Sequence, residues 1–134
     1  MAGGVEYVQG DFLTHPFDPG SFDMITAVAS LHHMDEQLAL SRMAWLLRPG
    51  GLLAVVGLAR TRSAHDFAVD LAGALATRVH RRSKQCWETP APKIWPPPHS
   101  YGQLRRASAA VLPGRQFRRR AMWRYILTWT RPGT

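Results

Sequence analysis

Two adjacent histidines, His32 and His33, are the residues of this chain whose types and spacing most invite chemistry. Neighbouring imidazoles could bind a metal ion or act as general bases. A zinc site needs about three converging protein ligands, and the nearest candidate for a third, His15, precedes a proline with nothing to orient it. As a general base, His33 has no orienting partner that the sequence identifies. We therefore predict no metal site and assign no catalytic residue.

The pair ends the segment SFDMITAVASLHHM, residues 21–34, which predicts a strand followed by a turn. Residues 22–28 are apolar on both faces apart from Asp23 and Thr26, which is typical of a buried strand in a parallel sheet. Asp35 is then expected to cap a helix. The apolar positions of that helix recur at spacings of three and four residues, at Leu40, Met43, Leu46 and Leu47. A proline–glycine turn at residues 48–51 and an apolar strand at residues 52–56 complete a βαβ unit, which implies a parallel sheet.

Shorter elements are predicted on either side of this unit. Residues 5–8 read as a short strand. A pattern that resembles a capping box, at residues 63–66, precedes a helix with one apolar stripe and a basic end; the stripe is Phe67, Leu71, Leu75 and Val79, and the basic residues are Arg78, Arg81, Arg82 and Lys84. Residues 85–100 carry five prolines and predict a loop, residues 101–112 predict a helix, and residues 123–129 alternate as a strand with an aromatic face. We expect a single domain over residues 1–134.

The charge of the chain is unevenly distributed. Residues 1–59 hold two Arg against six acidic residues, whereas residues 60–134 hold fifteen Lys and Arg against three acidic residues. A basic half could attract nucleic acid or an anionic membrane, but a solvated face rich in arginine explains it as well. With no transmembrane span, no signal peptide and a single cysteine, Cys86, the sequence predicts a soluble, cytoplasmic protein with no membrane partner.

Three motifs in order, VQGDF, SFDMITAVASLHHM and LLRPGGLLAVV, resemble the later motifs of class I S-adenosylmethionine-dependent methyltransferases that act on small molecules. The resemblance implies that Asp11 faces the adenine of S-adenosylmethionine and that Phe12 lines the adenine pocket. It also implies that Ala27, Val28 and His33 lie near the cofactor, and that His32 is a packing residue. The implied reaction transfers a methyl group to an O, N or C atom of a small molecule. Positioning supplies much of the rate of such a transfer.

The same resemblance implies a partial Rossmann-like α/β sheet that lacks the family's first two strands and closes with a C-terminal antiparallel hairpin. The family's glycine-rich cofactor loop has no counterpart here, so we expect an N-terminally truncated chain. Without those two strands, residues 22–28 would form an exposed apolar edge, through which the chain could self-associate. Either the strand at residues 5–8 closes the gap and pairs with residues 22–28, or the chain is a fragment of a longer protein. The family's Glu and Arg in the helix before the turn are replaced by Arg42 and Trp45, which could stack instead.

The resemblance also implies that the substrate side of the site lies in the region after the second strand of the βαβ unit. Its aromatic and imidazole residues, Trp87, Trp95, His99 and Tyr101, either line a substrate pocket or pack the loop. Two alternatives to a methyltransferase stay open. One is a non-catalytic, methyltransferase-like fragment that binds a partner. The other is a basic nucleic-acid-binding module that uses residues 78–84 and 115–124. Nucleic acid is a less expected partner than a small-molecule methyl acceptor.

Overall fold

The computed structural model describes residues 3–60, 64–83, 96–120 and 123–133. Four strands form one mixed sheet in the order β1-β2-β4-β3. β1 (Phe22–Val28) and β2 (Leu47–Leu58) pair in parallel, while β4 (Arg124–Thr130) is antiparallel to both β2 and β3 (Gln116–Arg120). The predicted βαβ unit and the C-terminal antiparallel hairpin are both confirmed.

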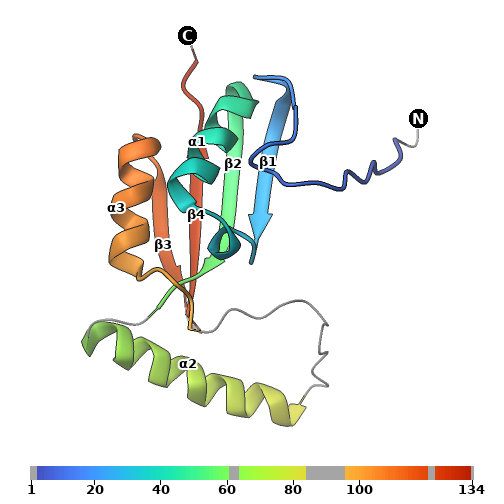
Figure 1. Ribbon diagram of the computed structural model, residues 1–134. Helices are drawn as coiled ribbons and strands as arrows, with labels where there is room; N and C mark the ends of the chain where they lie inside the picture. Colours follow the sequence, from blue (N-terminus) through green and yellow to red (C-terminus); the bar gives the residue numbers. More distant parts are fainter. Residues whose placement is uncertain (1–2, 61–63, 84–95, 121–122, 134) are drawn as a thin grey trace.

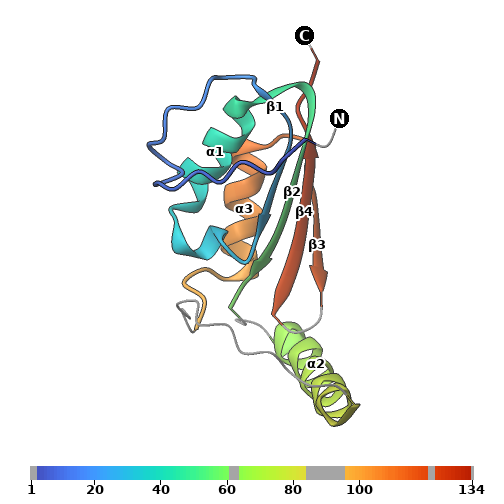
Figure 2. The same cartoon turned by 90° about the vertical axis from the view of Figure 1, so that its right-hand side faces the viewer.

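Helices cover only one face of this sheet (Figures 1 and 2). α1 (Glu36–Leu46) and α3 (Tyr101–Val111) lie side by side on that face, and the other face carries no described helix. The core between helices and sheet includes Leu40, Met43, Leu53, Val55, Leu104, Tyr125 and Leu127. Along β1 the burial alternates, with Ile25 and Ala27 toward the helices and Met24 and Val28 exposed.

Two expectations for the first strands are wrong. Residues 5–8 form no strand, and among the described residues β1 pairs with β2 alone. Residues 22–28 pair in parallel as predicted, but the strand is not buried on both faces, because it lies at the edge of a sheet that the described helices cover on one side. Among the described residues, the exposed apolar edge expected along residues 22–28 is therefore present.

The first helix begins where the sequence predicts. The Asp35 carboxylate accepts a hydrogen bond from the Leu38 amide at 2.9 Å, which caps α1. β2 follows without a loop at Leu47, earlier than the predicted strand at residues 52–56. The proline–glycine turn is a local irregularity within this strand: Phe22 pairs with Leu47, but Met24 pairs with Leu52. Gly50 has a φ of +78°, which glycine adopts without strain.

The aromatic face predicted for the last strand is confirmed. Tyr125, Leu127 and Trp129 of β4 are buried. The Tyr125 ring lies across Gly57 of β2, where a Cβ atom would come within 2.4 Å of the ring. It also stacks on Phe117 of β3 with the ring centroids 5.1 Å apart. A glycine in the central strand thus makes room for the largest fully buried side chain.

A separate helix, α2 (Ala64–Ser83), lies beyond the carboxyl ends of β1 and β2 (Figures 1 and 2). The chain leaves the sheet at Arg60 and returns at Ser100, and these two residues form a β-bridge. Ser100 and Gln103 then form a capping box that starts α3. Ser63, the first residue of the pattern at residues 63–66, lies outside the described residues, as does most of the Pro-rich loop. No described helix is both long enough and apolar enough to cross a bilayer.

Candidate functional site

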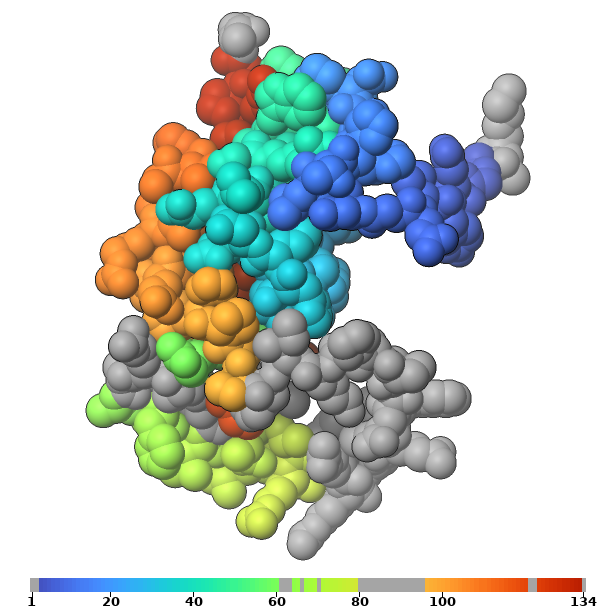
Figure 3. Space-filling view, viewed as in Figure 1, coloured from blue at the N-terminus to red at the C-terminus, as the bar shows by residue number. Residues whose placement is uncertain are grey.

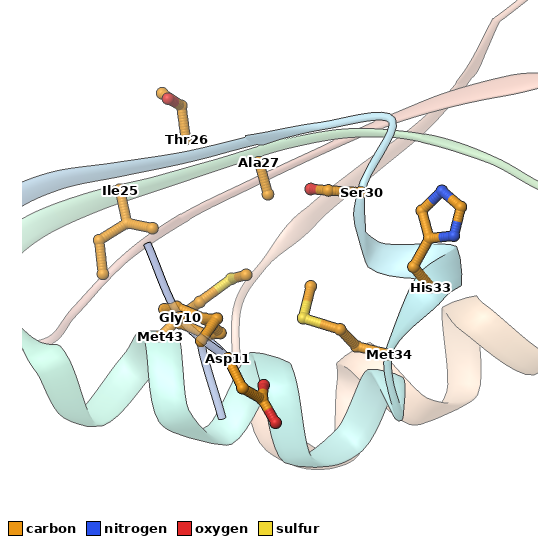
Figure 4. A pocket seen from close by; sticks show the side chains of 10 residues that line it. Gly10, Asp11, Ile25, Thr26, Ala27, Ser30, His33, Met34 and Met43 are labelled. Carbon is orange, nitrogen blue, oxygen red and sulfur yellow. The ribbon is translucent and has the colours of Figure 1, made fainter. Parts of the chain in front are cut away.

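A pocket of about 430 Å³ opens beside the carboxyl-terminal half of β1 (Figure 4). The segment before β1, the strand itself, the turn after it and helix α1 all contribute side chains. The lining residues are Gly10, Asp11, Phe12, Ile25, Thr26, Ala27, Ser30, His33, Met34 and Met43. Ligands in open α/β sheets bind at the carboxyl ends of strands, so the position of this pocket suits a binding site.

Four of the five predicted cofactor-side residues come together here. Asp11, Phe12, Ala27 and His33 line the pocket. Val28 does not line it, because it follows Ala27 in a strand and points to the uncovered face of the sheet, where it is 68% exposed. Sequence reasoning did not assign Met34 and Met43 to the site. Met43 had the spacing of a helix core residue, and no local signal distinguishes a core position from a pocket wall.

Arg42 of α1 fixes the segment that carries Asp11 and Phe12. Its Nε donates a hydrogen bond to the Phe12 carbonyl oxygen at 2.7 Å, and its Nη2 donates to the carbonyl oxygen of His15. The guanidinium also lies 5.7 Å from the Phe12 ring centroid and 5.9 Å from that of Trp45. The stacking suggested for Arg42 and Trp45 is therefore confirmed, and the same arginine holds one wall of the pocket.

Asp11 is oriented by its own backbone turn. Its Oδ1 accepts a hydrogen bond from the Leu13 amide at 2.9 Å, and its carbonyl oxygen accepts one from the His15 amide at 2.9 Å. The side chain stays exposed. A carboxylate at the rim of an apolar pocket can accept a hydrogen bond from an amino group on a flat ring that the pocket encloses.

The turn after β1 has an unusual backbone. Ala29 has a φ of +51°, a region that residues with a Cβ rarely adopt. Its amide donates a hydrogen bond to the Val56 carbonyl oxygen at 2.8 Å, which ties the turn to β2. The turn redirects the chain so that Ser30 and His33 reach the pocket (Figure 4). Such strained residues cluster at functional sites.

The two histidines differ in their surroundings. Their ring centroids are 4.1 Å apart, but His33 is exposed at the pocket whereas His32 is half-buried. Burial, with a smaller contribution from His33, lowers the pKa of His32 below its ordinary value. Within the part of the chain that the structure describes, His32 Nδ1 has no hydrogen-bond partner. No cluster of three metal-binding side chains occurs among those residues.

The residues proposed for the substrate side are only partly described. Trp87 and Trp95 lie outside the described residues. Tyr101 is buried in the core, and its hydroxyl donates to the Arg124 carbonyl oxygen at 3.4 Å. The His99 imidazole is 2.8 Å from the Glu36 carboxylate, between the first turn of α1 and the start of α3. This pair joins the two helices, and neither of its residues lines the pocket beside β1.

Comparison with known proteins relates this chain to methyltransferases. A family model described as a methyltransferase domain matches residues 1–55. Over 129 residues the chain is 36% identical to an uncharacterized methyltransferase of Mycobacterium tuberculosis, and the match covers 96% of this chain. The chain spans 65% of the length of that relative. It is also 38% identical over 65 residues to a ubiquinone/menaquinone biosynthesis C-methyltransferase of Idiomarina loihiensis, which covers 48% of this chain and 26% of that protein.

Solved structures show the same fold. An S-adenosylmethionine-dependent methyltransferase of Thermotoga maritima, described as a possible histamine N-methyltransferase, superposes with a TM-score of 0.56. The superposition covers 96% of this chain and 65% of the other, at 16% sequence identity. At that identity the likeness shows the fold alone, a partial version of the Rossmann-like sheet.

Proposed function

The chain belongs to the class I methyltransferases, and from this premise we propose that it takes part in S-adenosylmethionine-dependent methyl transfer to a small molecule. The observation that carries the proposal is the pocket beside β1, which brings Asp11, Phe12, Ala27 and His33 together from separate segments. Its walls, which include the Phe12 ring and two methionine side chains, fit a flat purine ring, and the Asp11 carboxylate at its rim suits the exocyclic amino group of that ring.

When bound, S-adenosylmethionine would supply a methyl group on a positively charged sulfur: a nucleophilic O, N or C atom would bond to the methyl carbon while the carbon–sulfur bond breaks, and S-adenosylhomocysteine would leave. In this proposal, Asp11 accepts a hydrogen bond from the cofactor, and Phe12, Met34 and Met43 exclude water from the ring. Arg42 keeps the wall formed by Phe12 in place. We assign no general base, because orientation and desolvation account for much of the rate of such a transfer.

We also propose that additional segments of polypeptide complete the cofactor site. The chain spans 65% of the length of the M. tuberculosis relative, and one face of its sheet is uncovered and carries exposed apolar residues such as Met24 and Val28. Both observations support a cofactor site that is completed by segments that pair with the open edge of β1. A partner bound at this edge, without methyl transfer, is the alternative.

Calorimetric titration tests the proposal directly. S-adenosylmethionine and S-adenosylhomocysteine are titrated into the 134-residue chain and into a version extended at its amino terminus by the upstream reading frame. Binding by either form supports the proposal, and binding by the longer form alone shows that this chain supplies part of the site. Binding by neither contradicts the methyltransferase function and favours the alternative.

A matched pair of variants links any binding to the pocket. Asp11→Asn removes the carboxylate that we assign to the cofactor and should weaken binding by about tenfold, as expected for a hydrogen bond to a charged group. Asp18→Asn makes the same change in the turn before β1, away from the pocket residues, and should leave binding unchanged. Equal losses in both variants would contradict the assignment of Asp11.

Nucleic-acid binding is not proposed. The three consecutive arginines of β3 do not form one basic stripe, since Arg118 and Arg120 are exposed whereas Arg119 is half-buried. The Arg119 guanidinium lies 4.2 Å from the centroid of the Tyr101 ring, on the face that α3 covers.

A further inference from the structure

Helix α2 exposes the side chains that a soluble helix normally buries. The large apolar residues of its stripe, Phe67, Leu71, Leu75 and Val79, are between 53% and 74% exposed. The less exposed positions of α2 are different: Gly73 is buried, and Val69 and Thr77 are half-buried. Residues 69, 73 and 77 recur at intervals of four on the side opposite the stripe. The helix therefore turns its large apolar side chains to solvent.

The stripe is long and continuous. Its four residues follow one another at intervals of four, so they form a single row that winds slowly around the helix. From Phe67 to Val79 this row extends about 18 Å along the helix axis. Figure 3 shows α2 in yellow-green at the lower end of the molecule, below α1 and α3 in that view. Removing this row from water would be favourable, roughly in proportion to the apolar area covered.

The charge at the end of the row indicates what covers it. Arg78, which is exposed, follows Leu75 by three residues, and Arg82 follows it by seven, so both positions lie on the same side of the helix as the stripe. Arg81 adds a third cation in the last turns. The row is therefore apolar along most of its length and cationic at its carboxyl-terminal end. A second copy of the chain bound to this row would bring the cations of the two helices together unless the helices ran antiparallel. An anionic bilayer offers both an apolar interior for the stripe and negative charge for the cationic end.

We propose that α2 is a membrane-surface helix that binds anionic lipid bilayers. The stripe enters the boundary between headgroups and acyl chains, and the exposed Arg78 reaches the lipid phosphates from the same side. The expectation of no membrane partner rested on the absence of a spanning segment, which does not bear on a helix that lies in the plane of the surface. The proposal goes beyond methyl transfer and does not depend on it.

The position of α2 gives this binding a consequence for the rest of the molecule. The helix lies beyond the end of the sheet at which β1 and β2 finish (Figure 1), and the pocket opens beside the carboxyl-terminal half of β1. A chain bound through α2 would hold that end of its sheet toward the bilayer.

Sedimentation with lipid vesicles tests the proposal on the full chain. The chain is mixed with vesicles of phosphatidylcholine alone and with vesicles that also contain phosphatidylglycerol. Binding to the anionic vesicles, reduced by salt and weaker on phosphatidylcholine, is expected. The variant Leu71→Ser/Leu75→Ser should reduce the bound fraction by at least about tenfold, because two apolar anchors are lost. Arg78→Gln/Arg82→Gln should reduce binding to anionic vesicles and lessen its salt dependence.

The matched control is Ala72→Ser/Ala76→Ser, which places the same two hydroxyl groups at exposed positions outside the stripe. It should bind within about twofold of the parent chain, since it changes little apolar area. Circular dichroism checks that every variant keeps the parent helix content. No binding to anionic vesicles, or equal losses in the leucine variant and the control, would overturn the proposal. A second result would also overturn the proposal: the parent chain forms an oligomer that the leucine variant does not form, and the parent chain does not bind vesicles.

Discussion

The Nε atom of Arg42 donates a hydrogen bond to the carbonyl oxygen of Phe12 at 2.7 Å, across thirty residues of sequence. Helix α1 thereby holds a segment that has no regular structure of its own but forms a wall of the pocket. A backbone carbonyl in such a segment is positioned by its partner, so the shape of the pocket depends on this arginine.

Arg42→Gln should therefore weaken cofactor binding by about tenfold, because hydrogen bonds from a charged donor to the Phe12 and His15 carbonyl oxygens are lost. Arg42→Lys should recover little of this loss, since an ammonium group does not reproduce the fork of the guanidinium. Calorimetric titration measures both variants. Arg48→Gln is the control: its ion pair with Asp23 is solvent-exposed and should contribute little. Affinity unchanged in Arg42→Gln would show that the wall is held by other contacts.

Gly57→Ala should lower the free energy of unfolding by about 1–3 kcal/mol, because the new methyl group would overlap the Tyr125 ring. Denaturant unfolding monitored by fluorescence measures the change. Gly102→Ala provides the comparison: the nearest side-chain atom to its new Cβ would be 3.9 Å away, within helix α3, so this variant should be as stable as the parent or slightly more so. Similar losses in both variants would contradict the crowding at Gly57.

The stability of the chain should depend on pH through His32. Its pKa is lowered in the folded state, so between that value and the ordinary 6.5 the unfolded chain binds more protons. The stabilising contribution is fully present above pH 6.5 and is lost as the pH falls below it. His32→Gln should flatten this part of the profile of unfolding free energy against pH, whereas His33→Gln should change it less. An unchanged slope in His32→Gln would contradict the assignment.

Asp35→Ala should destabilise the chain by about 1 kcal/mol, because the Leu38 amide loses its capping partner. Thermal unfolding measures the effect. Asp18→Ala lies in an exposed turn, where the backbone carbonyl of Asp18 rather than its carboxylate accepts a hydrogen bond from the Ser21 hydroxyl, so it should change the melting temperature much less. Equal shifts would indicate a general effect of charge removal.

The sequence predicted best where neighbouring residues determine the structure. The unit formed by β1, α1 and β2 was predictable because Asp35, the apolar spacing and the glycine turn all act locally. Residues 5–8 have a strand pattern, but a strand needs a partner, and none of the described residues supplies one. Local pattern alone does not report whether such a partner is present.

The candidate site, too, was predictable only where neighbouring residues or the order of motifs determine it. Asp11, Phe12, Ala27 and His33 were placed through the order of motifs, and the structure gathers them in one pocket. Val28 could have been separated from Ala27 by the alternation of side chains along a strand. The hydrogen bonds from Arg42 to the Phe12–His15 segment join parts of the chain that are distant in sequence, so no local signal revealed them.

The bridge between Arg60 and Ser100, where the Arg60 amide also donates to the His99 carbonyl oxygen at 2.8 Å, makes the segment between them a loop whose two ends already meet. The entropy of closing such a loop grows only with the logarithm of its length. This segment can therefore lengthen, shorten or change its sequence at little expense to the sheet. The segment between Arg60 and Ser100, which contains α2, can therefore adapt to a new surface or substrate during evolution while the strands and the pocket beside β1 stay unchanged.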